Sequence, residues 1–181
     1  MNDRTLHPNT RSMINAWRRL SNPTEGSAAL ENAASEDLVS RLFVLVLTSE
    51  GTWTFRHTTE TLGALLGKSL PDRNFSEFWS GHDKAIVGGV LESVAREQAP
   101  AIIRGRGETL LGRRVDLEIS LAPLMRPGDD APVNRLLGLY QTLGGEPMLE
   151  GRPVWRHTIT EAYPAPRAAS RPGLKIVVSN S

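Results

Sequence analysis

The clearest pattern in the sequence is a strict alternation between residues 114 and 122. The apolar members of this segment fall on one face of an extended strand and the polar members on the other: Val115, Leu117, Ile119 and Leu121 against Asp116, Glu118 and Ser120. Alternation with period two over this length predicts a strand that is buried on one side. Such a strand needs both neighbouring strands and a covering layer, which already excludes an all-helical fold.

The other strand patterns occur in two groups. Residues 42–48 are continuously apolar and are followed by the alternating segment 52–57, which predicts a hairpin. After the helical pattern of residues 82–98, segments 101–106 and 135–143 flank the alternating strand. Neither group can bury its apolar face alone, so both must share a sheet. We therefore expect an α+β fold with a five-stranded antiparallel sheet and helices on one face. A weak alternation at 157–163 is compatible with one further edge strand.

An amphipathic helix precedes this region. Asn9 or Thr10 can cap it, and its apolar side chains fall at helical spacing on one stripe: Met13, Ile14, Trp17 and Leu20. Such a stripe has to lie against the chain's own sheet or against a second copy. We choose it as the candidate surface for dimerisation or for a partner protein.

The expected organisation has three parts. Residues 1–34 hold an N-terminal tail, the amphipathic helix and a linker, residues 35–145 form the core domain, and residues 146–181 form a partly disordered C-terminal extension. The first ten residues are polar and lack the apolar stretch of a secretory leader, and no apolar run is long enough to span a membrane. We therefore expect a cytoplasmic location.

Composition excludes several kinds of chemistry. The chain has no cysteine, so disulfides and thiolate metal sites are absent. Its 21 Lys and Arg balance 20 Asp and Glu, and no basic cluster provides the footprint of a nucleic-acid binder. The histidines and acids do not cluster at metal-ligand spacing, and adjacent residues such as His82 and Asp83 do not face one site on a helix. No catalytic or phosphate-binding motif is present either.

Six segments in fixed order resemble a family of small stand-alone bacterial PAS proteins. Residues 75–79 (Phe-Ser-Glu-Phe-Trp) are similar to the Phe-x-x-Leu-Trp turn of that family, and residues 112–124 are similar to its Gly-Arg…Leu-Glu-x-x-Leu-x-Pro-Leu strand. The other four segments are residues 17–20, 53–62, 65–70 and 135–140. One departure is Thr59, which stands where the family prefers Gly.

The resemblance implies a non-catalytic signalling or regulatory module that acts through contact with a signalling protein or with itself, as a homodimer. The alternative is a small-molecule sensor whose apolar pocket holds haem, flavin or a metabolite. No cofactor is required, and the absence of cysteine excludes the flavin and coumaroyl chromophores that need one.

A candidate ligand pocket lies between the helices and the sheet. The side chains that can line this space, or simply fill it, are Trp53, Phe55, His57, Leu62, Trp79, Val90, Leu117 and Ile119. The alternation of the strand places His57 on the same face as Trp53 and Phe55. There it could bind a ligand, or it could be a buried histidine that bonds to the backbone.

Overall fold

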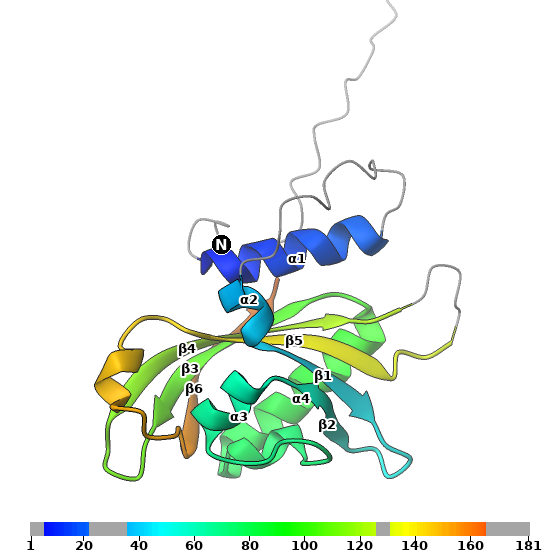
Figure 1. Ribbon diagram of the computed structural model, residues 1–181. Helices are drawn as coiled ribbons and strands as arrows, with labels where there is room; N and C mark the ends of the chain where they lie inside the picture. Colours follow the sequence, from blue (N-terminus) through cyan, green and yellow to red (C-terminus); the bar gives the residue numbers. More distant parts are fainter. Residues whose placement is uncertain (1–5, 22–35, 126–130, 166–181) are drawn as a thin grey trace, which may run out of the picture.

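One antiparallel sheet of six strands organises the protein, in the order β2-β1-β5-β4-β3-β6 (Figure 1). The computed structural model describes residues 6–21, 36–125 and 131–165. The strands are β1 (Leu42–Leu47), β2 (Trp53–Thr58), β3 (Ala101–Glu108), β4 (Arg114–Pro123), β5 (Arg135–Thr142) and β6 (Arg156–Pro164). The α+β fold expected from the sequence is confirmed, with one strand more than the expected five.

The two groups of strands do join in one sheet. β1 pairs with β2 on one side and with β5 on the other, where Val44 lies opposite Leu137. The sixth strand is the edge strand that the alternation at 157–163 suggests, and it pairs with β3. A short helix, η4 (Glu146–Leu149), connects β5 to this last strand. The sheet therefore continues to Pro164, beyond residue 145.

One face of the sheet carries the main core. The elements that cover it are α3 (Glu60–Leu66), η3 (Phe75–Phe78) and α4 (Gly81–Glu97). Aromatic rings fill the space beneath them: the ring centroid of Phe43 lies 5.4 Å from that of Phe55 and 5.5 Å from that of Phe75. Contacts of this kind between large buried rings stabilise a core beyond the area they bury.

The sequence explains where α3 begins and ends. Thr59 is its N-cap, and its hydroxyl accepts the Leu62 N–H at 3.2 Å and donates to the Ser40 carbonyl. This cap gives the threonine a direct role at the start of the helix. Gly67 ends the helix in the left-handed conformation with a φ of 61°, as the pattern predicts.

The opposite face of the sheet is covered by α1 (Pro8–Ser21) and α2 (Glu36–Ser40) (Figure 1). Met13 and Leu38 pack there against Ala122 and Leu139, and Ile14 packs against Ile102. The expected placement of the core helices on one face is correct for α3, η3 and α4, whereas the N-terminal helix lies on the other face. The linker at 22–34 and the segment after residue 165 lie outside the described residues.

Candidate functional site

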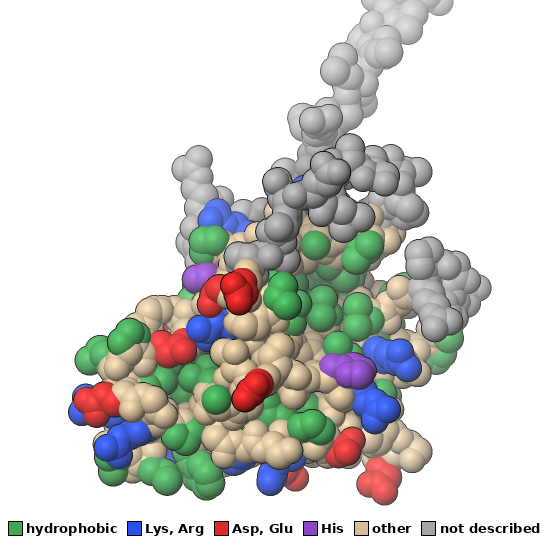
Figure 2. Space-filling view, in the orientation of Figure 1, with side chains coloured by type: hydrophobic (Ala, Val, Ile, Leu, Met, Phe, Trp, Pro, Cys, Tyr) green, Lys and Arg blue, Asp and Glu red, His purple; other side chains and the backbone are tan. Residues whose placement is uncertain are grey.

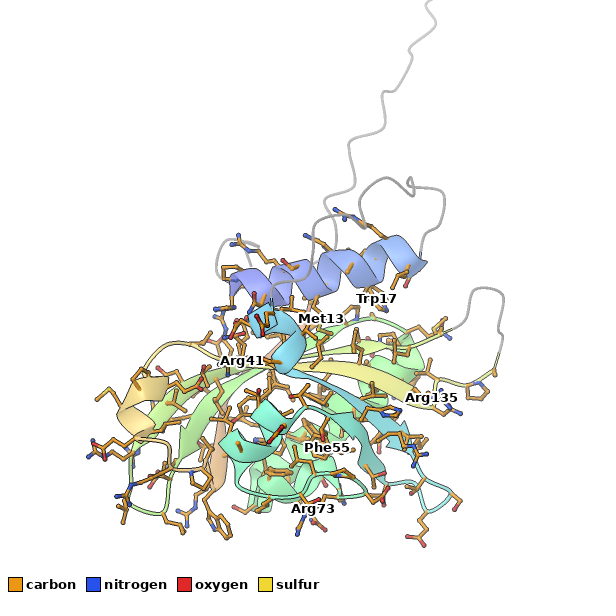
Figure 3. The ribbon with its side chains drawn as sticks, in the orientation of Figure 1. Met13, Trp17, Arg41, Phe55, Arg73 and Arg135 are labelled. Carbon is orange, nitrogen blue, oxygen red and sulfur yellow. The ribbon has the colours of Figure 1, made fainter. Side chains whose placement is uncertain are left out.

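The candidate pocket residues form part of the core. Val90 packs against the main core cluster. Six others are buried within that cluster: Trp53, Phe55, Leu62, Trp79, Leu117 and Ile119. Figure 3 shows Phe55 within this layer between the sheet and the helices. These side chains thus contact one another, and of the set only Trp53 also lines the groove described below.

The placement of His57 inside the core is wrong. His57 is exposed, while Phe55 two residues earlier is 1% exposed. The cause is a bulge in β2: Leu45 lies opposite Phe55 but Val44 lies opposite His57, so Arg56 is an extra residue. An extra residue shifts the alternation by one position and sends the side chains that follow to the other face. His57 therefore lies on the same side as Val44, outside the core.

A different histidine is buried, and little in the sequence pattern pointed to it. His157 on β6 lies in the main core, 2% exposed, with its Nε2 2.7 Å from the Tyr140 hydroxyl. Its ring is tilted against that of Trp79 at 5.1 Å and meets the edge of Phe78 at 5.7 Å. The one sequence signal at this position was the weak alternation of residues 157–163, which begins with this histidine.

Burial decides the protonation of this pair. Removal from water lowers the pKa of His157 to about 4, because the charged imidazolium loses its hydration, and nearby Lys68 lowers that pKa further. The backbone of Phe78 acts in the opposite direction, although Nδ1 makes no hydrogen bond of normal geometry. Burial likewise raises the pKa of the Tyr140 hydroxyl well above its usual value. Both groups are therefore neutral at physiological pH, and burial separates both from solvent.

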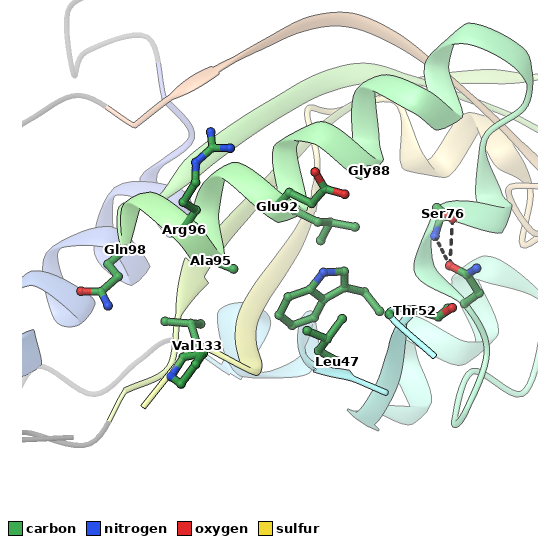
Figure 4. A pocket seen from close by; sticks show the side chains of 14 residues that line it. Leu47, Thr52, Ser76, Gly88, Glu92, Ala95, Arg96, Gln98 and Val133 are labelled. Atoms are coloured by element: carbon green, nitrogen blue, oxygen red, sulfur yellow. Dashed lines mark hydrogen bonds between the residues drawn. The ribbon is translucent and has the colours of Figure 1, made fainter. Parts of the chain in front are cut away.

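A groove of about 690 Å³ opens beside the C-terminal half of α4 (Figure 4). Apolar side chains from β1, β2, α4 and the segment just before β5 form much of its wall: Leu47, Trp53, Leu91, Ala95 and Val133. The polar lining includes Asn74, whose side-chain oxygen accepts the Ser76 N–H at 2.9 Å. The volume is in the range of sites for small organic molecules.

The candidate partner stripe lies mainly against the chain's own sheet. Met13 and Ile14 are buried, and Figure 3 shows Met13 and Trp17 pointing from α1 toward the sheet. The Trp17 indole N–H donates to the Pro123 carbonyl at 2.8 Å. Leu20 remains exposed. The sequence left open whether this stripe lies against the chain's own sheet or against a second copy. In this structure α1 lies against its own sheet.

A buried ion pair anchors the N-terminal segment to this face. Glu118 is 0% exposed, and one of its oxygens accepts from the Arg104 guanidinium at 2.7 Å and 2.9 Å. Its other oxygen accepts the backbone N–H of His7 at 2.9 Å. The alternation had placed Glu118 on the polar face of its strand, but α1 covers that face at this point and excludes water from it.

Across residues 6–21, 36–125 and 131–165 no three His, Asp or Glu side chains gather in a way that could hold a metal ion. No helix within those ranges is long and apolar enough to cross a membrane.

Several solved structures are similar to this chain at low sequence identity. A LOV protein from Rhodobacter sphaeroides is 14% identical, with a TM-score of 0.46, over 60% of this chain and 62% of that one. The LOV domain of a blue-light activated histidine kinase from Erythrobacter litoralis is 15% identical, with a TM-score of 0.44, over 57% of this chain and 94% of the other. A PAS domain from Colwellia psychrerythraea is 14% identical, with a TM-score of 0.42, over 56% and 86%.

Similarity at this level says nothing about a ligand or an activity. No curated protein matches the sequence of this chain. A sequence profile described as "PAS domain" matches residues 5–141, which includes α1 and the strands from β1 to nearly the end of β5. The resemblance seen in the sequence is thus confirmed over most of the chain, and the protein belongs to the PAS domain family of sensory and signalling modules.

Proposed function

We propose that this PAS module works without catalysis, through protein contact at the sheet face that carries α1. The surface in question, here called the outer seam, consists of Trp17, Leu20, Leu42, Val44 and Leu137. Its first expected partner is a second copy of the chain. The observation that carries the proposal is the apolar character of this seam, which α1 covers only in part.

The seam is apolar because β1 is apolar on both of its faces. Phe43 and Leu45 point into the core, so Leu42 and Val44 point to the outer face, where they are only partly buried. The facing residue Leu137 on β5 is also partly buried. Figure 2 shows hydrophobic side chains gathered along the junction between α1 and the strands below it. Strands buried on both faces read as continuous apolar runs, which is the pattern of residues 42–47.

Contiguous apolar surface of this kind marks interaction sites on proteins. Leu20 is 63% exposed in the last turn of α1. Burying such side chains against a second seam removes them from water, at about 25 cal/mol for each Å² of apolar area. A twofold pairing is favoured because the same patch then serves both copies.

The absence of catalysis is supported by where the perturbed groups lie. His157 and Tyr140 are the described residues with the most strongly shifted pKa values, and both are buried among aromatic rings. A general acid or base has to reach a substrate. A sealed pair of this kind acts in packing instead.

The test is the mass of the assembly in solution. Light scattering after size exclusion should give a dimer for the natural chain, while Trp17→Glu and Val44→Glu should shift it toward the monomer. Leu110→Glu is the matched control, because Leu110 is also exposed but lies on the β3–β4 hairpin away from α1. If Trp17→Glu leaves both the oligomer and the capture of a partner protein unchanged, the proposal fails.

The groove beside α4 favours a second candidate, a small-molecule sensor. Its volume of about 690 Å³ and its tryptophan-lined wall suit an organic ligand. Denaturing the protein purified from its own cells, followed by mass spectrometry, tests for a tightly held molecule. A colourless protein that releases nothing argues against a bound chromophore.

A further inference from the structure

Two consecutive glycines interrupt the middle of α4. Each glycine within a helix costs up to about 1 kcal/mol relative to alanine, a cost that close packing against a neighbouring element commonly explains. That explanation fails here, because a Cβ added to Gly88 or Gly89 would meet no atom within 4 Å. The two positions differ in one respect: Gly88 lines the groove, and the exposed Gly89 does not. The missing side chain of Gly88 therefore leaves space within the groove.

The wall of the groove beside Gly88 is aromatic. Trp53 is a core residue at 6% exposure, and it is also part of the groove lining. Leu91 and Ala95 follow Gly88 at helical spacing, so that one side of α4 continues this apolar wall. A ligand lying along α4 would thus rest its apolar part between the helix and the indole.

The groove is lined by one acidic side chain that has no partner among the described residues. Two charged side chains line it, Glu92 and Arg96. The Arg96 guanidinium bonds to Glu97 at 3.3 Å, and Figure 4 shows it extending away from Val133 and Leu47 across the helix. Glu92 lies four residues after Gly88 on the same side of α4, and its carboxylate has no hydrogen bond or ion pair with a described residue.

The C-terminal end of α4 adds to the negative charge at the groove. The helix ends at Glu97, and Gln98, which follows in the left-handed conformation, also lines the groove. The C-terminal turn of a helix carries a partial negative charge from its unpaired carbonyl groups. Both the helix end and Glu92 therefore attract a cation into this groove.

We propose that this groove binds a small organic ammonium ion, with the charged nitrogen at Glu92 and the apolar body against Trp53. Gly88 provides the room that the ligand occupies. The inference rests on the small-molecule candidate function given above and gives that function a ligand class. It does not depend on the outer seam.

The test compares three probes with the same aromatic body. Phenethylammonium carries a positive charge, 3-phenylpropionate a negative one, and 2-phenylethanol none. Each is titrated into the ¹⁵N-labelled full chain while the assigned indole N–H signal of Trp53 is followed by NMR. We expect a saturable shift with phenethylammonium. The dissociation constant of 3-phenylpropionate should be larger by about tenfold or more. Equal binding of the two ions, or no saturable shift of this signal with phenethylammonium, overturns the proposal.

Matched variants on α4 locate the site. Glu92→Gln should weaken phenethylammonium binding about fivefold, the scale of a partly exposed ion pair. Glu97→Gln should weaken it by less, because Glu97 lies outside the lining and acts only through its pair with Arg96. Gly88→Gln should abolish binding and Gly89→Gln should leave it unchanged. Both glycine variants improve helix propensity, so a folding defect does not confuse the result. A loss that is the same at 92 and 97, or at 88 and 89, contradicts the assignment.

The two proposals fail separately. Probe binding to a monomeric variant such as Trp17→Glu tests the groove without the seam, and light scattering of Glu92→Gln tests the seam without the groove.

Discussion

The hydroxyl of Tyr140 lies 2.7 Å from Nε2 of His157, and the pair joins β5 to the edge strand β6 inside the aromatic core. The two strands are not neighbours in the sheet, since β4 and β3 lie between them. The hydrogen bond therefore connects the edge strand to the centre of the domain through side chains. It also makes the stability of the edge strand depend on the protonation of one histidine.

Acid should destabilise the fold through this histidine. The pKa of His157 is lowered from 6.5 to about 4 in the folded chain, so below pH 6.5 the unfolded chain binds a proton that the folded chain does not. The contribution of the neutral histidine is thus complete above pH 6.5 and is lost as the pH falls toward 4. Between pH 7 and pH 5 we expect a loss of about 2 kcal/mol from this group, measured by urea denaturation.

The variant His157→Phe removes that titration and keeps a ring in the core. Its free energy of unfolding should be lower at pH 7, because the Tyr140 hydroxyl loses its partner, but it should change less between pH 7 and pH 5. The exposed His57 provides the control, and His57→Gln should keep the natural pH dependence. An identical pH slope in His157→Phe and in the natural chain would show that this histidine is not responsible.

The ion pair between Arg104 and Glu118 under α1 should stabilise the fold much more than the neighbouring pair between Arg106 and Asp116 on the same two strands. Glu118→Gln weakens the partner of Arg104 in a dry environment, and we expect a loss of about 2 kcal/mol of unfolding free energy. Asp116→Asn changes a pair in which both side chains are largely exposed and 3.4 Å apart, so its effect should stay below about 0.5 kcal/mol. Equal effects in denaturant titrations would contradict the structural difference between the two pairs.

Much of the fold follows from local pattern, because alternation and helical spacing report which face of an element is buried. The strand at 114–122 and the helix at 82–98 are examples, and both are present within about one or two residues of the expected ends. The pattern fails where a bulge adds a residue. In β2 the extra residue is Arg56, and in β6 it is Thr160, since Gly105 pairs with Ile159 and Arg104 with Glu161.

Both bulges lie in strands that carry a histidine. The bulge in β2 moves His57 out of the core, and the bulge in β6 separates the inward side of His157 and Ile159 from the outward side of Tyr163. The sequence of β6 therefore shows only weak alternation, although His157 is buried and Ile159 is partly buried. The groove was not predicted from the sequence either, because it combines residues of four separate segments, and spacing along the chain does not reveal which of them meet in space.

Glycines in α4 provide a test of the open space beside that helix. An alanine at Gly89 meets nothing within 4 Å and improves helix propensity, so Gly89→Ala should raise the unfolding free energy by up to about 1 kcal/mol. Gly88→Ala should have the same effect for the same reason. A melting temperature below that of the natural chain in either variant would show that the space is filled by something that the described residues do not include.

A third glycine should behave in the opposite way. Gly138 on β5 lies opposite Phe43 on β1, and a Cβ at this position would overlap the aromatic ring. Phe43 cannot move aside freely, because its ring is held by Phe55 and Phe75. We expect Gly138→Ala to lower the unfolding free energy by about 2 kcal/mol or more, since overpacking a close-packed core is costly.

In a Phe43→Leu background the loss of unfolding free energy caused by Gly138→Ala should be smaller by about 1 kcal/mol or more, because the smaller side chain leaves room for the methyl group. The double-mutant cycle measured by denaturant titration decides the point: additive effects would mean that the two side chains do not compete for this space.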